Sequence, residues 1–105
     1  MMIQNTEINS TAVAQLKGPV ILEFGASWCP HCQAAQANIA LALVKHPNIE
    51  HIKIEDGKGK RLGRFFLVKL WPTLVFLNDG VEKCRLVRPQ TAQEIIEALR
   101  IINSL

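Results

Sequence analysis

The sequence has little of what would place it in several common classes of protein. It contains no tyrosine and only three cysteines in 105 residues, too few for the disulfide framework of a small secreted domain. No apolar run approaches the roughly 20 residues of a membrane-spanning helix. The net charge is only +3, whereas nucleic-acid binding would call for more positive charge or for exposed aromatic residues interleaved with it. We therefore expect neither nucleic acid nor membrane as a partner.

Secretion is also not indicated. The first ten residues lack the basic stretch and the apolar stretch of a signal peptide, so a cytoplasmic location is expected unless a leader has been removed. Apolar residues make up 49% of the chain. A chain of this length can bury about two-thirds of its unfolded surface, and we expect one domain over residues 1–105.

The hydrophobic pattern predicts an α/β protein. The first helix has Ser10 or Thr11 as its N-cap, and Asp79-Gly80 forms a hairpin turn that makes the two strands around it antiparallel. We expect helices over residues 8–17, 30–45 and 60–68, a last helix capped by Thr91, and strands over residues 20–25, 49–55, 73–78 and 81–87. The crossover through the second helix makes its two flanking strands parallel. The expected fold is a three-layer α/β/α sandwich with a central mixed sheet of four or five strands.

The pentapeptide Trp28-Cys29-Pro30-His31-Cys32 follows the apolar strand 20–25 and opens the longest expected helix. This position puts the sulfur of Cys29 at a helix N-terminus, where free N–H groups and the helix dipole favour a thiolate. Cys32 lies three residues further on, within reach for a small disulfide ring. A nucleophilic thiolate with a resolving thiol is the machinery of thiol–disulfide exchange.

Zinc binding is the main alternative use of Cys29 and Cys32. A structural zinc site needs four ligands, and beyond this pair the chain offers only Cys84 and three scattered histidines. We therefore expect no metal, and no organic cofactor either, since a dithiol carries its own electrons. Cys84 is interpreted as a small apolar residue in a strand, with an exposed reactive thiol as the alternative. We expect His51 to face outward from its strand.

Two motifs together resemble the thioredoxin family over nearly the full chain. The first runs from Phe24 to Cys32, and the second is Trp71-Pro72-Thr73, about forty residues later, leading into a strand and the Asp79-Gly80 turn. The resemblance implies the thioredoxin fold and the activity of a protein-disulfide oxidoreductase.

The resemblance also implies roles for single residues. Cys29 matches the family's exposed nucleophile, Cys32 its buried resolving thiol, and Trp28 the tryptophan beside the nucleophile. Pro72 matches a cis-proline that packs beside the disulfide. Glu23 stands where thioredoxin has a buried aspartate that moves protons to and from the resolving cysteine; the alternative is a carboxylate that meets water at the end of the sheet.

The chain departs from the family pattern at four places. Pro30-His31 stands where thioredoxin has Gly-Pro and resembles the motif of periplasmic disulfide oxidases. Trp71 replaces a small aliphatic residue, Gly25 a second tryptophan, and Arg88-Pro89 a glycine that helps to leave the substrate groove open. The residues expected to bind substrate are Trp28, Trp71, Pro72, Thr73 and Arg88.

His31 bears on the direction of the reaction. A protonated imidazole near Cys29 would lower the pKa of that thiol and raise the reduction potential, whereas a solvated His31 would do neither. The expected function is reduction of protein disulfides by a monomer. An upstream thiol/disulfide reductase is expected to return Cys29 and Cys32 to the dithiol form. An oxidase or isomerase, and a non-catalytic thioredoxin-like interaction module, are the alternatives.

Overall fold

The computed structural model describes residues 2–4 and 8–104 of the chain. Its helices are α1 (Ser10–Ala14), α2 (Pro30–Leu43), α3 (Arg61–Phe65) and α4 (Ala92–Asn103), and its strands are β1 (Met2–Gln4), β2 (Pro19–Gly25), β3 (Glu50–Glu55), β4 (Thr73–Asn78) and β5 (Val81–Val87). The five strands form one sheet in the order β1-β3-β2-β4-β5. β1 and β2 both run parallel to β3, whereas β4 runs antiparallel to β2 and β5.

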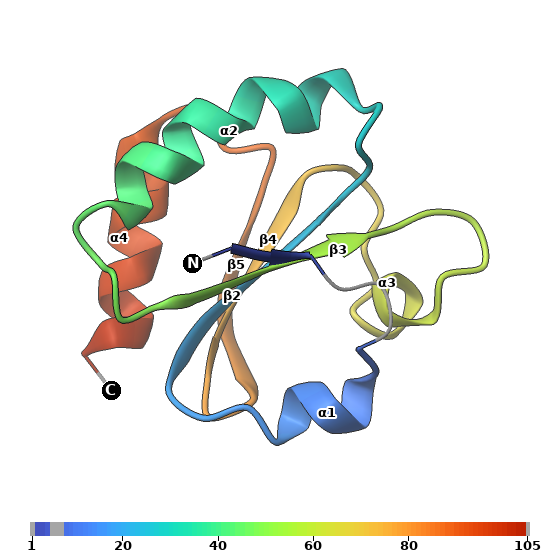
Figure 1. The fold of residues 1–105 in the computed structure, drawn as a ribbon, viewed down its shortest axis with the longest axis horizontal. Coiled ribbons are helices and arrows are strands. Elements are labelled where there is room, and N and C mark those ends of the chain that lie inside the picture. The colour runs from blue at the N-terminus through green and yellow to red at the C-terminus, as the bar shows by residue number, and fades with distance from the viewer. Residues whose placement is uncertain (1, 5–7, 105) are drawn as a thin grey trace.

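The helices cover both faces of this sheet. Figure 1 shows α2 and α4 on one side and α1 and α3 on the other. Two apolar clusters fill the space between the layers, one beneath α2 and α4 and the other beneath α1 and α3. The predicted three-layer sandwich and mixed sheet are confirmed.

The central strand β2 supplies side chains to both clusters. Val20, Leu22 and Phe24 point to the α1/α3 face, and each is fully buried. Ile21 points to the α2/α4 face, and the alternation of side chains along a strand sends Glu23 the same way. Glu23 is only 2% exposed, so the interpretation of a carboxylate that meets water is wrong.

The segments expected as strands number four, and the fifth strand, β1, comes from the N-terminus. It pairs with β3 along the edge that would otherwise be open, with Met2 opposite His51. β3 is therefore an inner strand, and α2 covers the face on which His51 lies. The expectation that His51 faces outward is wrong: its exposed fraction is 5%.

The helices are shorter than predicted at their ends. The N-cap of α1 is Asn9 rather than Ser10 or Thr11, because the Asn9 Oδ1 accepts a hydrogen bond from the backbone N–H of Ala12 at 2.8 Å. After α3 the chain turns at Leu67, whose φ of 58° is incompatible with a continuing helix. These differences concern ends, where local hydrogen bonds decide the last residue.

The hairpin and the last helix agree with their sequence signals. Asp79 and Gly80 have φ values of 50° and 78°, as a tight turn between β4 and β5 requires. Thr91 caps α4, and the Glu94 carboxylate accepts from the Thr91 N–H in return. The predicted strands 73–78 and 81–87 and the cap at Thr91 are confirmed.

Candidate active site

Cys29 lies at the junction between β2 and α2. It is the N-cap of α2, with φ −79° and ψ 118°, and Pro30 occupies the first turn, where a missing N–H costs nothing. The Cys29 Sγ accepts a hydrogen bond from the backbone N–H of Cys32 at 3.2 Å. Both cysteines are free thiols and are 4% and 6% exposed, so the expectation of an exposed Cys29 is wrong.

The two thiols have opposite acidities. Burial opposes ionisation of Cys29, but hydrogen bonds from the Cys32 thiol and from backbone N–H groups of Cys32 and His31, together with the charge of Arg88, outweigh it. The pKa of Cys29 is therefore lowered from its ordinary value. Burial and the hydrogen bond with Cys29 raise the pKa of Cys32 to about 12. Cys29 is therefore the thiol that ionises more readily and can act as the nucleophile. Cys32 stays protonated until the resolving step.

Two tryptophan side chains, Trp28 and Trp71, pack against each other beside the thiols. Trp28 is 68% exposed and meets Trp71 edge to face, with ring centroids 5.5 Å apart. Trp71 packs against the small cluster that contains both cysteines, and its indole N–H donates to Asp56 at 3.0 Å. The peptide bond between Trp71 and Pro72 is cis.

Arg88, the residue directly after β5, fixes the Trp71-Pro72 segment through two hydrogen bonds. Its Nε donates to the Trp71 carbonyl at 2.8 Å, and its backbone N–H donates to the Pro72 carbonyl at 2.9 Å. Its φ of 51° is one that glycine adopts most easily. Arg88 supplies positive charge near Cys29, whereas the exposed His31 contributes there through its backbone N–H. The effect of a protonated His31 imidazole stays a prediction.

Thr73 and Gly25 complete the surroundings of the thiols. Thr73 is 1% exposed and its hydroxyl donates to the Leu70 carbonyl at 2.6 Å, so the side chain fixes the turn before β4. A Cβ on Gly25 would lie 2.6 Å from the Cys32 Sγ. The Cys32 sulfur therefore occupies space that a side chain on Gly25 would fill.

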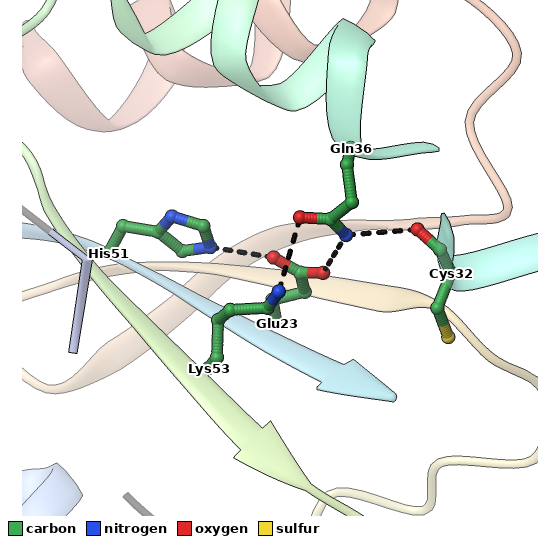
Figure 2. Close-up of polar contacts among 5 residues, drawn as sticks. All are labelled: Glu23, Cys32, Gln36, His51 and Lys53. Carbon is green, nitrogen blue, oxygen red and sulfur yellow. Dashed lines mark hydrogen bonds and ion pairs between the residues drawn. The ribbon is translucent and has the colours of Figure 1, made fainter. Parts of the chain in front are cut away.

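A polar network lies behind the thiols, on the α2 face of the sheet (Figure 2). The Glu23 Oε1 contacts the His51 Nε2 at 2.7 Å, and the Gln36 Nε2 donates to the Glu23 Oε2 at 2.7 Å. The same amide nitrogen donates to the Cys32 carbonyl at 2.9 Å, and the Lys53 Nζ donates to the Gln36 Oε1 at 3.2 Å. Gln36 therefore links the buried carboxylate to the helix turn that carries the resolving thiol.

These contacts keep Glu23 ionised. Burial alone would raise the pKa of the carboxyl, but the hydrogen bonds from His51 and Gln36 and the nearby charges outweigh it, and the pKa lies below its ordinary value of 4.5. Glu23 and Cys32 line one cavity of about 100 Å³. A cavity of this size has room for a water molecule between a carboxylate and a thiol.

Sequence reasoning missed three members of this network: Gln36, His51 and Lys53. Gln36 could have been found, because it follows Cys32 by four residues and so lies on the same side of α2. His51 and Lys53 alternate with the apolar Ile52 and Ile54, a pattern that also describes a solvated strand face. The burial of His51 and the partial burial of Lys53 depend on the position of α2.

The remaining cysteine and possible metal ligands lie apart from the site. Cys84 is half-buried on β5 and packs against the apolar cluster beneath α2 and α4, in agreement with the interpretation as a small apolar residue. Among residues 2–4 and 8–104, no group of three or more His, Cys, Asp or Glu side chains could hold a metal ion. Within the same residues, no helix is long and apolar enough to span a membrane.

A dithiol at a helix N-terminus, flanked by an X-Pro segment in a sheet of this topology, defines a thiol–disulfide oxidoreductase with the thioredoxin fold. The family model "Thioredoxin" matches residues 1–101, and the chain belongs to the thioredoxin family. It is 46% identical to thioredoxin 2 from Pseudomonas aeruginosa PAO1 in its reduced form, covering 97% of this chain and 95% of that one, with a TM-score of 0.86.

Similarity extends to curated relatives in other kingdoms. The chain is 25% identical to thioredoxin Asp f 28 of Aspergillus fumigatus over 83% of this chain and 81% of that protein. It is 32% identical to thioredoxin H-type 1 of Nicotiana tabacum over 70% of this chain, an alignment that spans 58% of the plant protein.

Proposed function

We propose that the protein reduces disulfides in other proteins, with Cys29 as the nucleophile and Cys32 as the resolving thiol. The observation that carries this proposal is the place of Cys29 at the N-cap of α2, where its Sγ accepts the backbone N–H of Cys32 at 3.2 Å. The lowered pKa of Cys29 and the pKa of about 12 at Cys32 agree with this assignment of roles. The Cys29 thiolate attacks a client disulfide and forms a mixed disulfide. Cys32 then attacks the Cys29 sulfur and releases the client as a thiol.

Glu23 is the group that accepts the Cys32 proton in this proposal. The shared cavity of about 100 Å³ and the ionised state of the carboxylate support this role. The ionised carboxylate also raises the pKa of Cys32, so the resolving thiol is protected from premature ionisation.

The client-binding surface in this proposal surrounds Cys29. Trp28 and Trp71 offer apolar area, Pro72 follows Trp71 through a cis peptide bond, and Arg88 fixes the Trp71 carbonyl. The partners are client proteins with accessible disulfides and an upstream dithiol donor that restores Cys29 and Cys32. The proposal includes a monomer acting in the cytoplasm as a single domain.

The test is trapping of the mixed disulfide. Cys32→Ser incubated with a disulfide-containing peptide should accumulate a covalent Cys29–peptide adduct, seen by mass spectrometry, because the resolving thiol is gone. Cys84→Ser is the matched control and should turn over as the unaltered protein does. A Cys32→Ser protein that forms no adduct would refute the redox function. Peptide binding that survives Cys29→Ser/Cys32→Ser would instead point to an interaction module.

A redox titration of the Cys29–Cys32 pair measures its reduction potential, which decides whether the protein reduces or oxidises its clients. Thioredoxin has a potential of about −270 mV and a periplasmic oxidase about −120 mV. We expect a midpoint near the lower value. A midpoint tens of millivolts higher, lowered again by His31→Ala, would assign oxidase or isomerase activity and give His31 the charge effect expected from its position.

A further inference from the structure

We propose that the protein prefers client disulfides with a carboxylate side chain beside the attacked cysteine, and that a cavity between His31 and Arg88 binds this carboxylate. The inference rests on the proposed function and deepens it, because it names the chemistry of the preferred client. Arg88 is the specificity-determining residue, since it contacts the client while Cys29 carries out the reaction.

The cavity lies where α2 faces the loop between β5 and α4 (Figure 1). It has a volume of about 130 Å³, and its polar walls come from His31 and Asn38 on the helix and from Arg88 and Gln90 on the loop. The Asn38 Nδ2 donates to the Gln90 carbonyl at 3.3 Å and so ties the loop to the helix. No aspartate or glutamate among the described residues lines the cavity. A cavity with room for a few water molecules also has room for a carboxylate.

Two walls of this cavity act directly on Cys29. A hydrogen bond from the backbone N–H of His31 and the charge of Arg88 both lower the pKa of the Cys29 thiol, so both groups lie close to its sulfur. A client sulfur that is bonded to Cys29 is equally close to the cavity. A side chain next to the attacked client cysteine is therefore within reach of Arg88.

Arg88 is the cation of this cavity, and it has no acidic partner among residues 2–4 and 8–104. Neither ion pair found within these residues includes it. Its Nε donates to the Trp71 carbonyl at 2.8 Å, whereas its two terminal nitrogens form no hydrogen bond within the same part of the chain. A guanidinium binds a carboxylate through two parallel N–H donors. A half-buried guanidinium that is fixed at one nitrogen and open at the other two is suited to bind a carboxylate.

The charge near Arg88 changes during the reaction. In the free protein its charge favours the Cys29 thiolate, which is the nearby anion. When Cys29 attacks, the bond between the two client sulfurs breaks and a bond between Cys29 and one of them forms. The electron pair leaves on the other client sulfur as a thiolate, so Cys29 is oxidised and the departing sulfur is reduced. The Cys29 sulfur is then neutral, and a client carboxylate takes its place as the anion beside Arg88.

Other polar groups around the loop leave Arg88 open to an anion from the client. The carboxylate of Glu94, which follows the loop, accepts from the backbone N–H groups of Gln90 and Thr91 at 2.8 and 2.9 Å. It caps α4 and does not line the cavity. The exposed His31 lines the cavity and carries a ring N–H donor whether its imidazole is neutral or charged. The polar surroundings of Arg88 therefore add a donor for a carboxylate rather than a competing acid.

The test measures client discrimination with two disulfide peptides that differ by one residue, a glutamate or a glutamine beside the attacked cysteine. Each kcat/KM is divided by the rate with a small dithiol reductant, which corrects for the reactivity of the peptide itself. We expect the glutamate peptide to be preferred about 3- to 10-fold at low salt, in the range of one half-buried ion pair. The preference should decrease as the ionic strength rises, and Arg88→Gln should abolish it.

The ratio of the two rates separates recognition from a general effect on the thiol, because a change in the acidity of Cys29 alters both rates alike. Lys83→Gln, at an exposed position on β5, removes the same charge and should keep the full preference. If Arg88→Gln fails to fold, Arg88→Gly suits the φ of 51° and should likewise abolish the preference.

The outcomes distinguish this inference from the proposed function. Equal corrected rates for the two peptides with the unaltered protein, or a preference that persists without the Arg88 side chain, would overturn the inference. Loss of the preference in Lys83→Gln would also overturn it, since net charge rather than this cavity would then select the client. An unaltered protein that reduces neither peptide would refute the proposed function instead.

Discussion

Leu22 and Glu23 are neighbours on β2, yet they point to opposite faces of the sheet and meet different surroundings. The buried cluster around Leu22 on the α1/α3 face is made of apolar residues, with Phe24 and Phe66 in contact at a centroid distance of 5.6 Å. The α2/α4 face around Glu23 combines an apolar cluster with a buried carboxylate and its hydrogen-bonding partners. Both side chains are closed to solvent, with exposed fractions of 0% for Leu22 and 2% for Glu23.

The two faces of the sheet therefore differ in what they contribute: the apolar cluster stabilises the fold, and the polar network serves the chemistry of the thiols. Burial of apolar side chains stabilises the fold without requiring any one partner, whereas a buried carboxylate is tolerated only when each oxygen is satisfied. No buried side-chain nitrogen or oxygen among the described residues lacks a hydrogen-bond partner. The polar network is thus complete, and it lies on the face that carries α2 and its two thiols.

The largest expected effect on stability comes from the apolar face. Leu22→Ala leaves a cavity in a fully buried cluster and should lower the free energy of unfolding by about 2–5 kcal/mol. The rate of client reduction by the folded protein should stay unchanged. Urea denaturation and a reduction assay well below the melting temperature check both halves. A rate that falls along with stability would contradict the separation of the two faces.

Substitution of Glu23 should lower the stability less than substitution of Leu22 does, but it should lower the activity more. Glu23→Leu leaves the buried His51 and Gln36 without their partner and should cost about 1–3 kcal/mol. Thiol release should slow because the proton acceptor is gone. The double variant Glu23→Leu/His51→Leu should be less destabilised than the sum of the single variants, a double-mutant cycle that measures the pair directly. Additive costs would show that the two side chains do not stabilise each other.

The smallest effect is a dependence of stability on pH. The pKa of Glu23 in the folded protein lies below its ordinary value of 4.5, so the folded state binds fewer protons than the unfolded state in this range. The stability that the ionised carboxylate contributes is fully present above the unfolded pKa and is lost as the pH falls through the folded one. The unaltered protein should therefore begin to lose its advantage over Glu23→Gln as the pH falls below the ordinary pKa of 4.5.

The control for this titration is Glu97→Gln, at an exposed position on α4. Urea denaturation of the three proteins between pH 7 and pH 3 gives the comparison. A difference between the unaltered protein and Glu23→Gln that stays constant down to pH 3 would contradict the lowered pKa.

Local signals in the sequence were sufficient for much of the fold. The β2–α2 junction, the Asp79-Gly80 hairpin and the cap at Thr91 each depend on residues a few positions apart, and each was predicted. Cys29 and Cys32 were found in the same way, because a helix N-terminus acts on the residues that begin it. The N-cap at Asn9 shows the limit of such signals, since several adjacent polar residues could have served.

The parts that the sequence did not reveal depend on contacts between distant segments. Arg88 follows Trp71 by 17 positions, and only the pairing of β4 with β5 brings its Nε to the Trp71 carbonyl. β1 joins the sheet through backbone pairing with β3, which the N-terminal sequence did not indicate. His51 and Glu23 are 28 positions apart, and they meet because the register of β2 with β3 places both on the face that α2 covers.

The sequence by itself determined the chemistry of this protein: two thiols at a helix start, a proline in the second motif, and a carboxylate within an apolar strand. These features are local, since each is specified by residue type and spacing. The tertiary structure alone decided the burial of each thiol, the charge of Arg88 near Cys29 and the partners of the carboxylate. Burial, hydrogen bonds and nearby charges from separate strands and helices set a pKa, and the folded arrangement of the chain creates those surroundings.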